Sequence, residues 1–171
     1  MHGAVGRWAF GEGDATLEAA LGARLKKVRR TLAVAESCTG GLLGGRLTAA
    51  RGSSSWFHGG VIAYDNSVKT KLLRVSSSLL KKHGAVSTEC AEAMARGVRR
   101  AAGTDIGIAI TGIAGPDGGT KEKPVGTVHV AVSGPAASRI SKKLLLHGPR
   151  ETVRSRAVTA ALALLKESLD K

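Results

Sequence analysis

The segment of residues 31–45, TLAVAESCTGGLLGG, constrains the fold most because its character changes abruptly in the middle. Its first five residues are mostly apolar and are bounded by charged residues, which predicts a buried strand. Ser37 and Thr39 then precede Gly40 and Gly41, and leucines follow at helical spacing. A strand that turns into a helix in this way places hydroxyl oxygens and backbone N–H groups where an anion or a developing oxyanion can bind. An ordinary helix N-cap formed by Ser37 or Thr39 explains the same residues.

The rest of the chain alternates between helical and strand patterns. Strands separated by helices indicate parallel pairing, whereas the last two strands, joined by a Gly-Pro turn, indicate a hairpin. We therefore expect one α/β domain over residues 15–171, with a mixed, mostly parallel sheet and helices packed on its faces, after a loose segment of residues 1–14. Helices are predicted over residues 14–30, from the glycine turn to about 50, after 65–67, over 76–83 (a short helix or turn), between 87 and 103, and from about 150. Strands are predicted over residues 31–35, 59–64, 105–111, 126–133 and 138–146.

The composition limits the classes of function. A chain of 171 residues with 23 glycines and 3% aromatic residues suffices for one core built from Ala, Val, Leu and Ile. It contains no apolar run near the roughly 20 residues of a membrane span, no signal-peptide pattern and only two separate cysteines, so we expect a cytoplasmic protein without membrane contact. The net charge of +13 favours anionic ligands. Because no aromatic residues alternate with the basic ones, we expect no specific nucleic-acid binding.

A second glycine loop, residues 112–119, follows the strand that ends at Thr111. If this strand lies parallel and close to the first one, both glycine loops open at the sheet edge where α/β proteins bind ligands. Neither loop has a Walker or dinucleotide-binding pattern, and Ser37 lies outside an esterase GxSxG motif. No histidine spacing favours a Ser–His–Asp triad, and no His/Cys/Asp cluster has metal-ligand spacing. We therefore expect neither a cofactor nor a metal.

Lys69 is the candidate for a catalytic base. It lies about one helical turn into the segment that follows the strand ending at Tyr64. A lysine takes a proton from a serine only when neutral, and lowering its pKa from about 10.4 to about 7–8 by burial or nearby positive charge costs about 4 kcal/mol. Tyr64, the one tyrosine of the chain, could relay or orient that proton. A surface lysine beside Lys71 explains the same residue.

Arg150 lies where a positive charge is disfavoured. It falls in the first turn of the predicted last helix, where it opposes the helix dipole by roughly a few tenths of a kcal/mol or more. Either the neighbouring Glu151 offsets this charge or a bound anion does, and the residues alone favour neither explanation.

Several motifs together resemble the CinA C-terminal domain family, whose enzymatic members are the PncC-type nicotinamide-nucleotide amidohydrolases. The resemblance covers about residues 15–168, and its two long glycine motifs are highly specific in combination. The N-terminal stretch FGEGDATLEAALGARL (residues 10–25) resembles the linker that precedes this domain in longer, two-domain CinA proteins, so the chain is a shortened CinA, a fragment or a free-standing amidohydrolase. The motifs are AESCTGG (residues 35–41), GGVIAYDNSVK (59–69), HGAVS (83–87), TGIAGPDGGTKEKPVGTV (111–128) and GPRETVR (148–154).

The resemblance implies hydrolysis of the carboxamide of nicotinamide mononucleotide to nicotinate mononucleotide and ammonia, in pyridine-nucleotide salvage and without a metal. It implies that Ser37 is the nucleophile and Lys69 the base, with Tyr64 nearby, and that Arg150 holds the phosphate. The other residues implied to bind substrate are Thr39, Gly40, Gly41, Asn66, Thr111, Gly112, Gly115, Asp117 and Gly118.

Two functions without catalysis compete with this interpretation. A competence- or DNA-damage-associated accessory protein would account for the family name and the net charge of +13. A nucleotide-binding regulator would use the same loops without chemistry. In each case we expect a homo-oligomer with at least two-fold symmetry.

Overall fold

The computed structural model describes residues 16–135 and 139–170. The expected loose segment, residues 1–14, lies outside this range. The helices are α1 (Leu17–Lys27), α2 (Leu42–Ala49), α3 (Asn66–Lys71), α4 (Ser77–His83), α5 (Thr88–Ala102) and α6 (Arg150–Leu169), and a 3-10 turn, η1, spans Ser53–Ser55. The strands are β1 (Leu32–Glu36), β2 (Phe57–Ile62), β3 (Ile106–Gly112), β4 (Thr127–Ser133) and β5 (Arg139–Leu145). Their order along the chain is the predicted one.

The strands form one sheet in the order β2-β1-β3-β4-β5. β1 pairs in parallel with both β2 and β3, so Glu36 lies between Ile62 and Ile110 at the carboxyl end of the parallel part. β4 runs antiparallel to β3 and β5, and β4 and β5 form the predicted hairpin. The α/β fold with a mixed sheet is confirmed, since four strands run in one direction and only β4 runs in the other.

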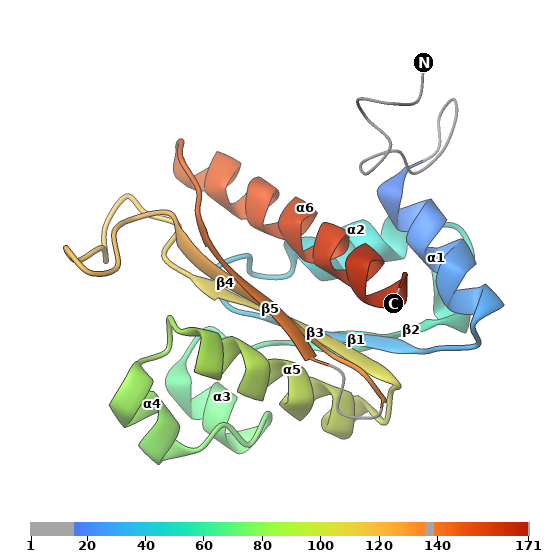
Figure 1. Ribbon diagram of the computed structural model, residues 1–171, viewed down its shortest axis with the longest axis horizontal. Helices are drawn as coiled ribbons and strands as arrows, with labels where there is room; N and C mark the ends of the chain where they lie inside the picture. Colours follow the sequence, from blue (N-terminus) through green and yellow to red (C-terminus); the bar gives the residue numbers. More distant parts are fainter. Residues whose placement is uncertain (1–15, 136–138, 171) are drawn as a thin grey trace.

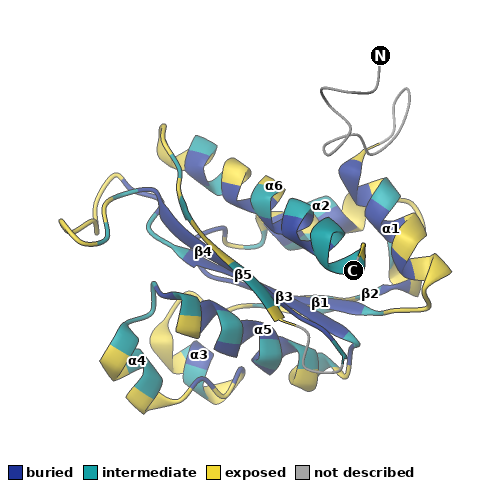
Figure 2. Cartoon of the chain, viewed as in Figure 1, coloured by how far each residue is buried: buried dark blue, intermediate teal, exposed yellow. Residues whose placement is uncertain are grey.

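Helices cover both faces of the sheet (Figure 1). α1, α2 and α6 lie on one face, and α3, α4 and α5 lie on the other. The first face packs large aliphatic side chains such as Leu25, Leu43 and Leu162 against the sheet. Figure 2 shows the central strands as buried, and every residue of β1 and of β4 is buried, whereas β5 is partly exposed. The ends of the central strands are therefore held rigidly between two hydrophobic layers.

The face under α5 allows a closer approach because its sheet residues are small. A Cβ on Gly107 of β3 would lie 2.1 Å from the carbonyl oxygen of Ala95 in α5. A Cβ on Gly97 of α5 would lie 2.1 Å from the carbonyl oxygen of Leu73, which follows α3. Glycine is therefore needed at both positions for α5 to pack at this depth. The sheet contributes four alanines to the same core: Ala33, Ala35, Ala109 and Ala131.

Two element boundaries differ from the prediction in informative ways. β1 includes Glu36, whose charge had marked it as the residue beyond the strand, although only 1% of its surface is exposed. β2 starts at Phe57 rather than at Gly59. Because the preceding residue, Trp56, is buried, the chain enters the sheet two residues earlier than predicted. The Trp56 ring packs against α1, where a Cβ on Gly22 would lie 2.9 Å from the indole.

Candidate active site

The carboxyl ends of three parallel strands bring the sequence motifs together. Ser37 follows β1, Tyr64 lies two residues after β2, and Thr111 is the next-to-last residue of β3. Because β1 is the middle strand of the three, both neighbouring segments flank Ser37. The two glycine loops thus open at one sheet edge, as expected if their strands were parallel neighbours.

A pocket of about 270 Å³ opens at this edge. Most residues that the sequence suggested as a site line it: Ser37, Tyr64, Asn66, Lys69, Thr111, Gly112, Gly115, Asp117, Gly118 and Arg150. Thr39, Gly40 and Gly41 do not line it and lie behind Ser37 in the turn that leads into α2. The remaining lining comes from residues that sequence reasoning had not singled out: Cys38, Ala85, Val86, Ile113 and Ala114.

Lys69 is buried in the wall of the pocket, with 1% of its surface exposed. Its Nζ donates hydrogen bonds to the main-chain carbonyls of Ala63, at 2.7 Å, and Tyr64, at 3.0 Å, and lies 3.4 Å from Ser37 Oγ. It takes part in no ion pair within the described chain. Burial lowers the pKa of Lys69 below its ordinary value, against smaller opposing effects of Cys90 and Asp65. The alternative of a surface lysine is therefore wrong.

The segment that carries Lys69 is fixed by its own helix cap. The Asp65 side chain accepts a hydrogen bond from the Ser67 amide at 2.7 Å and caps α3, the helix predicted after residues 65–67. Tyr64 contributes its carbonyl to Lys69, while the residue itself is 64% exposed. Its hydroxyl makes no hydrogen bond among the described residues. Tyr64 therefore orients Lys69 through the main chain.

Glu36, rather than Ser37 or Thr39, caps α2. Its buried carboxylate accepts three hydrogen bonds from main-chain amides, those of Gly41 and Leu43 at 3.1 Å and that of Gly44 at 2.8 Å. These amides belong to the first turn of the helix and have no acceptor within it. The negative charge of the Glu36 carboxylate therefore already compensates the partial positive charge of the helix N-terminus. The helix N-terminus is consequently not free to bind an anion, and the candidate oxyanion donors lie earlier in the turn.

Thr39 sits in this turn without using its hydroxyl. The residue is fully buried, and its Oγ1 has no hydrogen-bond partner within the described part of the chain. A buried unsatisfied hydroxyl costs about 1–3 kcal/mol. Neither the helix cap nor the packing of the turn accounts for this hydroxyl.

The opposite wall of the pocket joins two motifs that are distant in sequence. Thr111 Oγ1 donates to the carbonyl of Ala85 at 2.8 Å. Lys123, from the glycine-rich loop, donates through Nζ to the carbonyls of His83 at 2.9 Å and Val86 at 2.7 Å. The segment HGAVS and the loop after β3 therefore form one bonded unit facing Ser37.

Two arginines of α6 face the turn and the loops. Arg150 lines the pocket and donates one hydrogen bond, from Nη1 to the carbonyl of Gly115 at 2.6 Å. Arg154, one helical turn further on, donates from Nε to the Cys38 carbonyl at 3.2 Å and from Nη2 to the Thr39 carbonyl at 2.9 Å. Arg150 thus keeps most of its five N–H donors available at the pocket, whereas Arg154 is committed to the protein.

Cys38 is the other nucleophilic group in the lining. Burial raises the pKa of its thiol to about 11, and the nearby Arg150 opposes this only weakly. The thiol is therefore protonated at neutral pH and does not compete with Ser37 as a nucleophile.

Known proteins resemble this chain in sequence and in fold. The family model for the CinA C-terminal domain matches residues 14–169. The chain belongs to the CinA family. Among curated relatives, a CinA-like protein of Gemmatimonas aurantiaca is 55% identical over 164 residues, which is 96% of this chain and 38% of the relative. A protein of Moorella thermoacetica named for competence-damage induction is 50% identical over 165 residues, 96% of this chain and 40% of the relative. The chain thus spans about two fifths of these relatives.

Solved structures of the CinA superfamily share the fold. A superfamily protein from Klebsiella pneumoniae superposes with a TM-score of 0.86 at 35% identity, over 90% of this chain and 96% of that one. A competence/damage-inducible protein from Agrobacterium tumefaciens gives 0.85 at 33% identity, over 94% of this chain and all of that one. These neighbours align over nearly their full length, so the described residues of this CinA chain share their fold.

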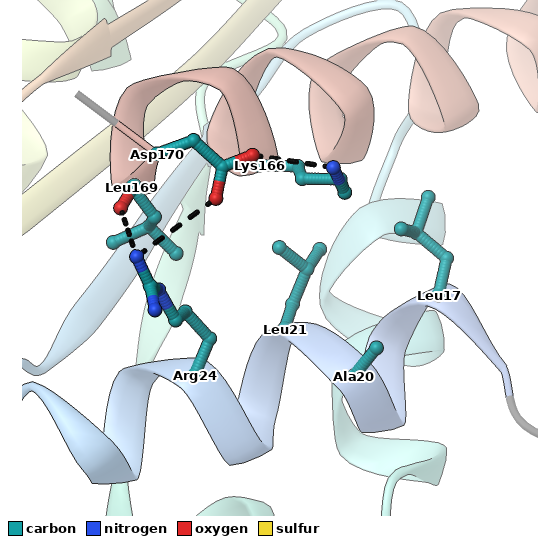
Figure 3. A pocket seen from close by; sticks show the side chains of 7 residues that line it. All are labelled: Leu17, Ala20, Leu21, Arg24, Lys166, Leu169 and Asp170. Atoms are coloured by element: carbon teal, nitrogen blue, oxygen red, sulfur yellow. Dashed lines mark hydrogen bonds and ion pairs between the residues drawn. The ribbon is translucent and has the colours of Figure 1, made fainter. Parts of the chain in front are cut away.

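A second hollow lies away from this site, between α1 and α6 (Figure 3). It measures about 160 Å³ and is lined by apolar side chains such as Leu17 and Leu21, while Arg24 closes one end by bonding the Leu169 carbonyl and pairing with Asp170. It reaches the far end of α6, roughly 24 Å from Arg150 at 1.5 Å of helix rise per residue. None of the motifs shared with CinA contributes to it, so we place the chemistry at the sheet edge.

Within the described residues no group of three or more His, Cys, Asp or Glu side chains is arranged to hold a metal ion. In the same part of the chain, no helix combines the length and hydropathy that crossing a bilayer would require.

Proposed function

We propose that this CinA-family chain hydrolyses the carboxamide of nicotinamide mononucleotide, releasing nicotinate mononucleotide and ammonia. The observation that carries the proposal is the buried Lys69, held by two main-chain carbonyls and 3.4 Å from Ser37 Oγ. A buried lysine without a carboxylate partner is costly to the fold, and such perturbed groups gather at catalytic sites. Membership of a family with amidohydrolase members supports the reaction class.

The hydrogen bonds around Lys69 favour its function as a base. A neutral lysine has two N–H bonds and one lone pair. The carbonyls of Ala63 and Tyr64 occupy the two N–H bonds, which leaves the lone pair for the Ser37 hydroxyl. After proton transfer the third N–H points back toward Ser37, where it can be passed to a leaving group.

The first half of the reaction forms an ester between Ser37 and the nicotinoyl group. Ser37 Oγ attacks the amide carbon while Lys69 takes the hydroxyl proton, and the electron pair of the carbonyl moves onto its oxygen. We assign the stabilisation of this oxyanion to the amides of Cys38 and Thr39, because the Gly40 amide donates to the Ser37 carbonyl at 3.1 Å. One such donor is typically worth about 3–4 kcal/mol of transition-state stabilisation.

The second half returns the enzyme to its starting state. Protonated Lys69 gives its proton to the amide nitrogen, the C–N bond breaks, and ammonia leaves. A water molecule, deprotonated by Lys69, then attacks the ester, and the proton passes to Ser37 Oγ as nicotinate mononucleotide is released. Protons and electrons balance without a metal or an organic cofactor.

The nucleotide end of the substrate would lie toward α6. Arg150 offers unused guanidinium donors in the pocket lining, and it stands at the first turn of a 20-residue helix. Phosphate binds well to a guanidinium and to helix N-terminal amides. A bound phosphate would also explain the cation at this position, so of the two explanations for Arg150 we propose the anion.

Ammonia release from nicotinamide mononucleotide, without added metal, tests the proposal. We expect turnover in the wild type and a loss of at least about 10³-fold in Ser37→Ala and in Lys69→Ala, because nucleophile and base act as one unit. Lys71→Ala is the matched control, since Lys71 is an exposed lysine on the same helix. Absence of wild-type turnover would refute the substrate, and turnover that survives Lys69→Ala would refute the base.

A second function is favoured by the names of the relatives, which refer to competence and DNA damage. It would use the net charge of +13 for nucleic-acid binding. A salt-dependent DNA affinity that Ser37→Ala leaves unchanged, in a protein without turnover, would support it. Self-association with two-fold symmetry and a cytoplasmic location remain predictions under either function.

A further inference from the structure

Arg154 of α6 contacts the nucleophile turn, which we define as residues 37–41 between β1 and α2. Its side chain is 20% exposed and makes four hydrogen bonds. Two of them go to the consecutive carbonyls of Cys38 and Thr39, and the other two go to the carboxylate of Glu151 at 2.9 and 3.1 Å. The planar guanidinium fork matches two adjacent acceptors, a geometry that a lysine ammonium does not reproduce.

The contact fixes the direction of one amide. In a trans peptide the C=O and N–H bonds point in opposite directions. Because Arg154 holds the Cys38 carbonyl toward α6, the Thr39 N–H on the same peptide faces away from α6. The guanidinium charge also polarises this peptide, which makes the N–H a stronger donor.

Like the Cys38 amide, the Thr39 amide has no acceptor among the described residues, whereas the amides after it are all paired. The Gly40 amide donates to Ser37, the Gly41 amide to Glu36 and the Leu42 amide to Thr39. Among the described residues no acceptor is found for the Thr39 N–H. A free, oriented donor two residues after the nucleophile is the arrangement that an oxyanion hole requires.

We propose that Arg154 is a positioning residue, which holds the Cys38–Thr39 peptide so that the Thr39 N–H stabilises the oxyanion formed by attack of Ser37. This inference rests on the proposed acyl transfer by Ser37. It separates the two arginines of α6 by role: Arg150 faces the pocket and binds the substrate, whereas Arg154 does not line the pocket and acts through the backbone.

The first test is steady-state kinetics with nicotinamide mononucleotide. We expect Arg154→Met to lower kcat by about 10²-fold, the scale of one lost oxyanion donor, while KM changes by less than about threefold. Arg154→Lys keeps the charge but loses the fork, so its kcat should fall between those of the wild type and Arg154→Met. A rise in KM with unchanged kcat would overturn the proposal, because Arg154 would then bind substrate directly.

Two variants serve as controls. Arg156→Met removes another arginine of α6 that also donates to a main-chain carbonyl, that of His147 at 2.7 Å, but far from the turn. Glu151→Gln removes the carboxylate partner of Arg154 and leaves both carbonyl contacts possible. We expect both variants to retain kcat within about twofold, and thermal unfolding of all variants will show that they are folded.

The second test does not depend on the nicotinamide substrate. A fluorophosphonate probe modifies an active serine and places an oxygen in the oxyanion hole, so its rate of reaction with Ser37, followed by mass spectrometry, reports the donor directly. Slower labelling of folded Arg154→Met and Arg154→Lys, in that order, would support the proposal even if the wild type failed to hydrolyse nicotinamide mononucleotide. Equal labelling rates in the wild type and Arg154→Met would overturn it.

Discussion

Substitution of Glu36 by glutamine tests how the nucleophile turn is held. The carboxylate receives three main-chain N–H bonds, and the amide of a glutamine of the same shape can accept at only one of its two ends. If its oxygen keeps the Gly41 and Leu43 amides, its NH₂ group faces the Gly44 amide, donor against donor. One charge-assisted bond is then lost and two become neutral.

These changes set the expected magnitude. A hydrogen bond to a charged group contributes about 1.5–3 kcal/mol and a neutral one about 0.5–1.5 kcal/mol. Glu36→Gln should therefore lower the free energy of unfolding by about 4 kcal/mol, a large share of the roughly 5–15 kcal/mol of a typical domain. Because the side chains are isosteric, no cavity contributes.

Urea unfolding followed by circular dichroism measures the effect. Glu122→Gln makes the same chemical change at an exposed loop carboxylate and should alter the free energy of unfolding by less than about 0.5 kcal/mol. A loss below about 1 kcal/mol in Glu36→Gln would refute the reasoning, since it would mean that the three amides find other acceptors at little cost.

Further predictions concern Lys69, Thr39 and Cys38. Because burial lowers the pKa of Lys69, kcat/KM should rise with pH and level off below 10.5, and a plateau only above that value would contradict the base assignment. Between the pKa of Lys69 in the folded protein and 10.5, the unfolded chain binds more protons than the folded one, so the free energy of unfolding of the wild type should rise with pH. Urea titrations at pH 7 and pH 10 measure this increase, and Lys69→Met should abolish it. Thr39→Val should raise the free energy of unfolding by about 1–2 kcal/mol by removing an unpartnered buried hydroxyl, and a fall in kcat/KM in this variant would show instead that the hydroxyl contacts substrate. Iodoacetamide at pH 7 should leave activity unchanged, because the pKa of Cys38 is about 11, whereas rapid inactivation with alkylation of Cys38 would show an accessible thiolate.

The fold was largely predictable because its signals are local. Each strand and helix has its own period of apolar residues, and the glycine loops mark the turns, so both the order of elements and the mixed sheet followed. The boundary at Glu36 was misjudged for a physical reason: a charged residue ordinarily stays out of a buried strand, but here three amides satisfy it.

The site was less predictable because it depends on strand order. The contact between Ser37 and Lys69 requires β2 to lie next to β1, which neither segment specifies by itself. Arg154 is the last residue of the motif GPRETVR, but the motif does not indicate what the side chain contacts, since its partners are main-chain carbonyls and any residue can supply those.

The position of β2 at the edge of the sheet determines which part of the structure is lost first in heat or denaturant. The base is assembled within a short segment, because the carbonyls that hold Lys69 belong to residues 63 and 64 and the lysine itself follows on α3. The proposed nucleophile, Ser37, directly follows β1. The pairing of β1 with β2, which ends in the bond from the Ala63 amide to the Glu36 carbonyl at 2.7 Å, joins the two segments. Strands at the margin of a sheet detach before its centre melts. Mild heat or denaturant should therefore abolish the proposed activity reversibly while most of the secondary structure persists, because loss of this one strand pairing separates Lys69 from Ser37.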